Sequence, residues 1–282
     1  MNNIKLIADS SSDLPEDVIK EYDLGLVRLN VAFGDEDVSN ISNDEFYAKM
    51  RTYPILPKTS APSPEKFLEQ FQLAGIDKDI IVVSLAEKLS STIGSAKLAK
   101  ELYGEESNKK VMVLESGQGS IGLGILVMKI AQMIEEGVSF DDIGKKYEEI
   151  RNNIVHYGVL DTLENAIKGG RVNKAQGIIA NALNIKAIIE VVDGVVSPID
   201  KSRGSKNGIK KAVDIFVNKI EEKKKDHHYT ILGIAHANSP EKANLVLDEL
   251  KGRLSFDRVV VAEIGSLMGT YTAEGAVLIS AI

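Results

Sequence analysis

Short apolar runs alternate with amphipathic segments along the first half of the chain. Three of these runs are typical of buried strands, and each ends in a serine-rich polar turn that leads into a helix. The runs are residues 4–8, 80–83 and 110–114. Strand–helix alternation predicts a parallel sheet with helices on both faces. Ligands bind beyond the carboxyl ends of the strands in such sheets, so we expect the three polar turns to converge on a site.

The second half of the chain mixes an antiparallel hairpin with strand–helix–strand units. Residues 186–199 form two apolar runs around Asp193-Gly194, a pair typical of a type I′ turn. Further strands are expected at residues 156–160, 229–235, 258–263 and 276–281. The Gly- and Thr-rich residues 265–275 are expected to form a loop. The pattern therefore predicts a mixed sheet in this half.

The chain has 282 residues, of which 44% are hydrophobic and 27% charged, as in soluble globular proteins. We predict an N-terminal α/β domain over residues 1–155 and a C-terminal α/β domain over residues 156–282, a division that the length allows. No apolar run approaches the roughly 18 residues of a membrane span. The first residues also lack the apolar core of a signal peptide. We therefore expect a cytoplasmic protein.

The net charge and the residue composition argue against several classes of partner and cofactor. The net charge of −7 and the pI of about 5.3 argue against a nucleic-acid partner bound through a broad basic face. The absence of cysteine excludes thiolate nucleophiles and disulfides, and the four histidines show no ligand spacing, so we expect no metal. Neither a P-loop nor a complete GxGxxG spacing is present, which disfavours a nucleotide. We expect no cofactor.

Residues 80–99 contain the first candidate site. A buried strand is followed by Leu89, Ser90, Ser91 and Thr92, where a helix of small residues begins. Hydroxyls and unpartnered N–H groups of a first helical turn suit an anionic oxygen. Ordinary N-capping by Ser or Thr explains the same residues and, for this stretch alone, is the more frequent explanation.

Two further segments allow both a structural and a functional interpretation. Residues 58–63 lie among four prolines, which form either a rigid linker or a stiff loop that holds a hydroxyl in place. Gly169 ends a helix and Arg171 follows it. This pair is either a C-cap with an exposed charge or an arginine presented to an anion.

Seven short motifs are spread over the chain. They are DSSSDLP at 9–15, KTSAPS at 58–63, LSSTIGSA at 89–96, ESGQGSIGLG at 115–124, GGR at 169–171, SRG at 202–204 and GTYTAEG at 269–275. Each is weak by itself. In this order and spacing they resemble the motifs of the DegV family of bacterial fatty-acid-binding proteins, and the resemblance covers essentially the whole chain.

The resemblance implies two α/β domains with a long-chain fatty acid between them. Hydroxyls would hold its carboxylate, and arginines would assist at the head group; the matching positions are Thr59, Ser90, Ser91 and Tyr271 for the carboxylate, and Arg171 and Arg203 for the assistance. Family members present the acid to a separate ATP-dependent kinase, which forms an acyl phosphate. The chain would then be a lipid-binding subunit without catalytic residues, in transient contact with a membrane.

Physical chemistry agrees with lipid binding. Burial of an acyl chain contributes about 0.8 kcal/mol per methylene, so a long tail would supply most of the affinity. The apolar side chains of Ile178, Ile179, Ala180 and Leu183 are candidates for its walls, or for ordinary core. His236, at a strand end, is expected to be structural.

Departures from the family pattern concern the head group. Tyr271 replaces the histidine of the family's GTHTGPG motif, and a tyrosine does not become cationic near neutral pH. Ser91 replaces the glycine of LSGTYQSA.

Two alternatives remain from the sequence. The first is an enzyme that acts on a small carboxylated or phosphorylated metabolite, because the same polar edge and arginines would suit one, although no nucleophile–base set is apparent. The second, a nucleic-acid-binding regulator, lacks a basic face.

Overall fold

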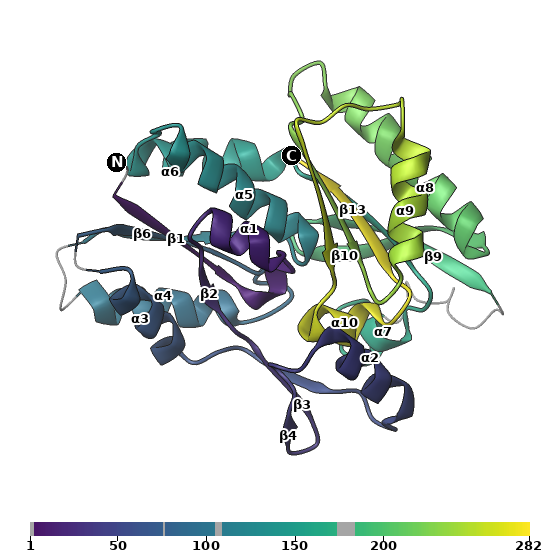
Figure 1. Ribbon diagram of the computed structural model, residues 1–282, viewed down its shortest axis with the longest axis horizontal. Coiled ribbons are helices and arrows are strands. Elements are labelled where there is room, and N and C mark those ends of the chain that lie inside the picture. The colour runs from purple at the N-terminus through teal and green to yellow at the C-terminus, as the bar shows by residue number, and fades with distance from the viewer. Residues whose placement is uncertain (1–2, 76, 105–108, 174–183) are drawn as a thin grey trace.

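The N-terminal half forms the parallel sheet that the sequence predicts. The computed structural model describes residues 3–75, 77–104, 109–173 and 184–282, and Figure 1 shows its arrangement. Four parallel strands lie in the order β2-β1-β6-β7. They are β1 (Ile4–Asp9), β2 (Gly25–Val27), β6 (Asp79–Ser84) and β7 (Val111–Glu115).

Helices cover both faces of this sheet, which is why β6 is an uninterrupted apolar run. Ile80 and Val82 pack under α3 (Pro64–Leu73) and α4 (Thr92–Gly104). Ile81 and Val83, on the opposite face, belong to the cluster that contains α5 (Ile121–Glu135). Strands buried on both faces lose the alternation of polar and apolar residues. The short η1 (Ser10–Ser12), α1 (Glu16–Glu21) and α6 (Phe140–Asn152) complete this half.

The C-terminal half contains a six-stranded mixed sheet in the order β10-β9-β8-β13-β11-β12, which confirms the prediction. Its strands are β8 (Val155–Leu160), β9 (Ile185–Val192), β10 (Val195–Arg203), β11 (Ile231–His236), β12 (Arg258–Glu263) and β13 (Val277–Ala281). Only the β11–β12 pair is parallel among the described ladders of this sheet. The predicted boundary between residues 155 and 156 falls within the start of β8.

The predicted hairpin is present as β9–β10. Asp193 and Gly194 have φ values of 47° and 72°, the positive pair that a type I′ turn requires. The register shifts between Pro198 and Asp200, and β10 continues to Arg203. The strand is therefore longer than the expected end at residue 199, because this irregularity lets the chain rejoin the ladder.

Helix α5 lies between the two sheets and joins the two halves (Figure 1). A Cβ at Gly233 of β11 would lie 2.4 Å from Ile121 Cγ1, so glycine allows α5 to approach the C-terminal sheet closely. The outer face of that sheet packs against α8 (Ser205–Lys223) and α9 (Pro240–Leu250). The molecule is thus a stack of alternating helical and sheet layers.

A small third sheet and three short helices lie beside the junction of the halves. The sheet has the order β4-β3-β5, and its strands are β3 (Asn30–Phe33), β4 (Glu36–Asp37) and β5 (Lys58–Ser60). The helices are α2 (Asn43–Thr52), α7 (Glu164–Lys168) and α10 (Ser266–Thr272). No helix within the described ranges has the length and apolar character needed to cross a membrane.

The expectation of a loop over residues 265–275 was wrong, because α10 occupies most of this segment. Glycine and threonine are weak helix formers, and tertiary packing overrides their preference here. Leu267 and Thr270 are buried, and a Cβ at Gly269 would lie 2.5 Å from Tyr47 Oη. Tyr47 Oη also donates to Ile264 O at 2.8 Å, which fixes the start of the segment.

Candidate functional site

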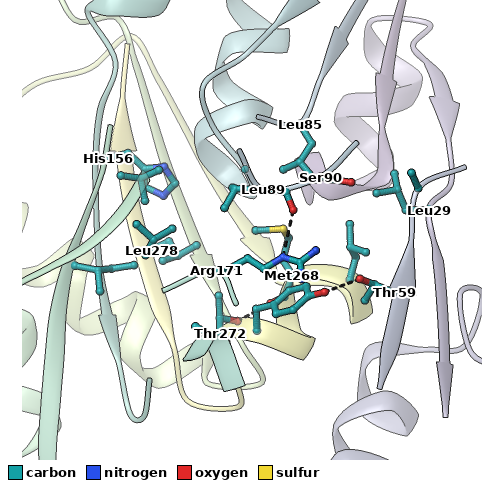
Figure 2. A pocket seen from close by; sticks show the side chains of 18 of the residues that line it. Leu29, Thr59, Leu85, Leu89, Ser90, His156, Arg171, Met268, Thr272 and Leu278 are labelled. Carbon is teal, nitrogen blue, oxygen red and sulfur yellow. Dashed lines mark hydrogen bonds between the residues drawn. The ribbon is translucent and has the colours of Figure 1, made fainter. Parts of the chain in front are cut away.

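A cavity of about 290 Å³ lies between the two halves of the molecule (Figure 2). Its walls are mostly apolar side chains from both halves: Leu29, Leu85, Leu89, Leu160, Ile189, Val191, Val196, Leu267, Met268 and Leu278. The pleat of the C-terminal sheet turns alternate residues of β8 and β9 toward it. A cavity with this lining suits a hydrocarbon chain.

Hydroxyls and a guanidinium gather at one end of the cavity. Thr59, on β5, and Tyr271, on α10, lie with Oγ1 and Oη 2.5 Å apart. The pairing of Thr59 with Val31 of β3 holds β5 in place. The Arg171 guanidinium lies over the Tyr271 ring, 4.5 Å from its centroid. Three of the predicted residues therefore meet at this end of the cavity.

Backbone carbonyls fix the Arg171 side chain. Its Nε donates to Leu89 O at 3.2 Å and its Nη1 donates to Gly169 O at 2.6 Å. Gly169 is required by a close approach, since a Cβ there would lie 2.4 Å from Tyr271 Cε1. Arg171 is thus a held cation at the cavity rather than a freely exposed charge.

Ser90 and Ser91 line the same cavity at the start of α4. Ser90 Oγ lies 2.8 Å from Thr92 Oγ1 and accepts a 3.4 Å hydrogen bond from Thr92 N, the first residue of α4, so Ser90 also has a local structural role at the start of this helix. The Ser90 side chain is half-buried, whereas Ser91 is exposed. The local hydrogen bonds of Ser90 thus leave its place in the lining of the cavity unchanged.

Other predicted residues lie elsewhere. Arg203 is exposed at the end of β10 and is not among the residues that line the cavity. The candidate wall at 178–183 lies outside the described residues. His236 is buried away from the cavity and its Nδ1 accepts from Ser239 N at 3.3 Å, a contact within its own turn.

The three serine-rich turns contribute unequally to the cavity: residues 89–91 and Gly119 line it, whereas none of residues 9–13 does. Ser11 and Ser84 donate to the buried carboxylate of Asp9, and Ser120 donates to Asp13 Oδ2 at 2.5 Å. These turns are occupied by internal carboxylates, which need hydrogen bonds because they are buried.

The two buried aspartates have perturbed ionisation. Burial raises the pKa of Asp9, although four hydrogen bonds act in the opposite direction. Burial also raises the pKa of Asp13 to about 7, against hydrogen bonds from Ser120 and from the N–H of Gly265. The Gly265 N–H lies 2.9 Å from Asp13 Oδ1, so this carboxylate links the N-terminal turn to the C-terminal half.

His156 lines the cavity and was missed by the sequence interpretation. It lies on β8 with only 3% of its surface exposed, and its Nδ1 is 2.8 Å from Gln118 Oε1. Burial lowers its pKa to about 4, so the imidazole is neutral at pH 7. The available signal was a lone polar residue at the start of an apolar strand.

The fold and the cavity define a class: α/β proteins that enclose an apolar chamber with a polar end between two halves. The chain belongs to the DegV family, since the profile of that family, described as "uncharacterised protein, DegV family", matches residues 3–282. This confirms the resemblance that the seven motifs indicate.

Related proteins match over nearly the full length of the chain. A DegV domain-containing protein of Caldanaerobacter subterraneus is 31% identical, covering 98% of this chain and 97% of its own. The crystal structure of a DegV family protein from Ruminococcus gnavus, with vaccenic acid, is 27% identical with a TM-score of 0.89, and the match covers 99% of this chain and 100% of that one. The fatty acid kinase (Fak) B3 protein of Streptococcus pneumoniae, loaded with linoleic acid, shares the fold at 23% identity and a TM-score of 0.84, covering 99% of both chains.

Proposed function

We propose that the protein binds a long-chain fatty acid, with the tail in the cavity and the carboxylate at Thr59, Ser90 and Arg171. The observation that carries the proposal is the cavity itself, which is apolar along its walls and has hydroxyls and a held guanidinium at one end. The related R. gnavus protein, whose structure contains vaccenic acid, supports it.

The two ends of the cavity contribute differently to binding. The tail supplies most of the free energy, at about 0.8 kcal/mol for each buried methylene. A hydrogen bond to the charged head group contributes roughly 1.5–3 kcal/mol and offsets the loss of hydration. The polar end therefore sets where the carboxylate lies, while the walls set the overall affinity.

Lipid extraction and native mass spectrometry of the protein purified from bacteria test the proposal. We expect a co-purified fatty acid at close to one per chain. A protein that carries none, and that also fails to bind added oleate, would overturn the proposal.

A double variant tests the head-group residues. Thr59→Ala with Ser90→Ala should weaken oleate binding by roughly a hundredfold or more, because two hydrogen bonds to a charged group are lost. Thr52→Ala with Ser63→Ala is the matched control, since it removes one Thr and one Ser hydroxyl that are exposed and lie outside the cavity. Equal affinities for the two double variants would show that the anchors are misassigned.

We further propose that the protein presents the carboxylate to a separate ATP-dependent kinase. Two observations support this role: the exposure of Ser91 beside the polar end, and the fold shared with the Fak B3 protein. The protein mixed with ATP alone should form no acyl phosphate, and addition of a fatty acid kinase should produce it. Phosphoryl transfer by the isolated protein would instead favour an enzyme.

A further inference from the structure

His156 lies among apolar side chains at the end of the cavity away from Thr59 (Figure 2). Its neighbours in the lining include Leu160 of the same strand, Ile189 of β9 and Leu278 of β13. These three side chains carry no hydrogen-bonding group. The carboxylate is proposed to lie at the other end of the cavity, so it does not account for a polar side chain here.

One edge of the imidazole ring is covered by protein. Nδ1 lies 2.8 Å from Gln118 Oε1, and a Cβ at Gly122 would lie 2.4 Å from Nδ1 and 2.9 Å from Cε1. Neither Gln118 nor Gly122 lines the cavity, whereas His156 does. The covered edge therefore faces α5. Gln118 and His156 itself also line a separate hollow of about 330 Å³.

The other edge carries Nε2, which is buried and has no hydrogen-bond partner among the described residues. Buried polar atoms are nearly always paired, because an unpaired one loses its hydration without compensation. A water molecule needs two to four polar partners, and the neighbouring side chains of Leu160, Ile189 and Leu278 offer none. A polar group that is part of a bound ligand is held in place by the rest of that ligand, so it needs fewer polar partners than a water molecule does.

We propose that the cavity selects fatty acids that carry a hydroxyl group along the acyl chain, with His156 Nε2 as the partner of that hydroxyl. A hydroxyl both donates and accepts, so it pairs with the ring whichever nitrogen carries the proton. A methylene at the same place leaves Nε2 unpaired. This inference rests on the proposed fatty-acid function and names the ligand class of that site.

The test compares octadecanoic acid with a series of monohydroxylated octadecanoic acids in which the hydroxyl moves along the chain. Equilibrium binding to the wild-type protein should show one position, in the part of the chain away from the carboxylate, that binds roughly five- to a hundredfold more tightly than the unsubstituted acid. In the variants His156→Phe and His156→Leu this preference should disappear or reverse.

Leu29→Met is the matched control, because it changes a cavity side chain that lies near Thr59 and away from His156 (Figure 2), while keeping its volume and apolar character. It should alter the affinities for both acids by the same factor and leave their ratio unchanged. The ratio of the two affinities is taken within each variant, so general effects on folding cancel. The preference of the wild-type protein can be measured without any variant.

The outcomes separate the two proposals. Binding of octadecanoic acid without preference for any hydroxylated acid overturns the role of His156 and leaves the fatty-acid function intact. A preference that persists in both His156 variants also overturns it. Failure of the wild-type protein to bind any of the acids overturns the fatty-acid function and this inference together.

Discussion

The Tyr271 side chain makes two contacts at the polar end of the cavity. Its hydroxyl reaches Thr59 Oγ1 and its ring supports the Arg171 guanidinium. The family motif has a histidine at this position, which could supply the hydrogen bond but has a smaller ring. The tyrosine at this position therefore keeps a hydrogen-bonding group beside Thr59 and places a larger aromatic ring against the Arg171 guanidinium.

Replacement of Tyr271 by Phe should separate these contacts. The variant retains the ring under Arg171 and loses the hydrogen bond to Thr59, so we expect oleate affinity to fall by about three- to tenfold. Tyr229→Phe is the control, because its hydroxyl bonds Asn153 O at 3.0 Å outside the cavity. Isothermal titration calorimetry measures both. Unchanged affinity of the Tyr271 variant would show that the Tyr271 hydroxyl does not orient Thr59 for binding.

Asp13 gives the protein a defined dependence of stability on pH. The folded protein keeps a proton on Asp13 up to about pH 7, whereas the unfolded chain loses it near the ordinary value of 3.8. Between these values the folded state binds more protons, so this group lowers the free energy of unfolding as pH rises, by up to about 1.4 kcal/mol per pH unit. The stability that protonated Asp13 provides is fully present only below about pH 4.

An Asp13→Asn variant isolates this contribution. Its stability relative to the wild-type protein should increase from pH 4 to about pH 7 and then stay level, as measured by urea unfolding at a series of pH values. His156 has the opposite effect on the free energy of unfolding, which decreases as pH falls from 6.5, the ordinary pKa of histidine, toward about 4. This contribution is the same in both proteins and cancels when they are compared. Parallel pH profiles would contradict the assignment to Asp13.

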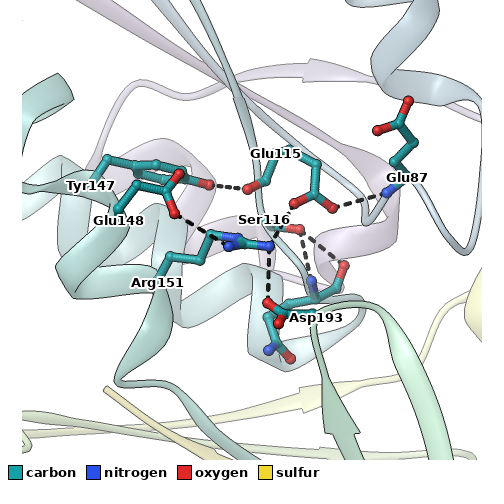
Figure 3. Close-up of polar contacts among 8 residues, drawn as sticks. Glu87, Glu115, Ser116, Tyr147, Glu148, Arg151 and Asp193 are labelled. Carbon is teal, nitrogen blue, oxygen red and sulfur yellow. Dashed lines mark hydrogen bonds and ion pairs between the residues drawn. The ribbon is translucent and has the colours of Figure 1, made fainter.

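At the scale of elements, the β9–β10 hairpin acts as one wall of the cavity and is fastened at its tip (Figure 3). Arg151 of α6 pairs with Glu115, Glu148 and Asp193, each at 3.0–3.4 Å. Gly194 N donates to Gly117 O at 2.7 Å. Val191 and Val196, close to this tip, line the cavity. These contacts therefore hold the cavity-lining part of the hairpin against the N-terminal half.

The variant Asp193→Asn should speed the release of a bound fatty acid. It removes one ion pair with Arg151 and keeps the turn, since Asn-Gly also favours type I′. The Asp193 side chain is 58% exposed, so a rate increase of no more than about fivefold is expected. Asp200→Asn is the control, because Asp200 lies on the same hairpin and the change removes its ion pair with Lys211 of α8. Stopped-flow displacement measures the rate, and equal rates for both variants would exclude a fastening role.

Sequence patterns predicted the elements well where local signals were strong. The apolar run of β6 and the Asp193-Gly194 turn carry their structure in a few neighbouring residues. The helix α10 could not be predicted, because Tyr47, far away in the chain, packs against its glycine. The serine-rich turns could not be sorted either, since the carboxylates that occupy two of them become partners only after folding.

At the scale of the whole molecule, the cavity belongs to neither half alone. Its lining runs from Leu29 to Leu278 in the sequence, and α5 packs against both sheets. The short motifs drew attention to Thr59, Ser90, Arg171 and Tyr271, and all four line the cavity. The position of His156 beside the cavity depends on how β8 and α5 meet, which no local pattern reveals.

A bound fatty acid should stabilise both halves together. At a free ligand concentration of about 100 Kd, the free energy of unfolding should increase by about 2.7 kcal/mol. Thermal unfolding followed by circular dichroism should show one transition that shifts upward with oleate. The Thr59→Ala, Ser90→Ala variant should shift less at the same oleate concentration. Two separate transitions, with only one responding, would show that the halves unfold independently.

The place of β13 has a consequence for how the protein is made. This strand lies between β8 and β11 in the middle of its sheet, although it follows both in the chain. The parallel sheet is complete once β7 has been synthesised, whereas the mixed sheet must wait for residue 281. At roughly 5–20 residues per second, the nascent chain leaves the ribosome with β8 and β11 unjoined for seconds. The apolar strands β8 and β11 therefore lack their common partner in this interval, and the cavity, which Leu278 of β13 helps to line, does not yet exist.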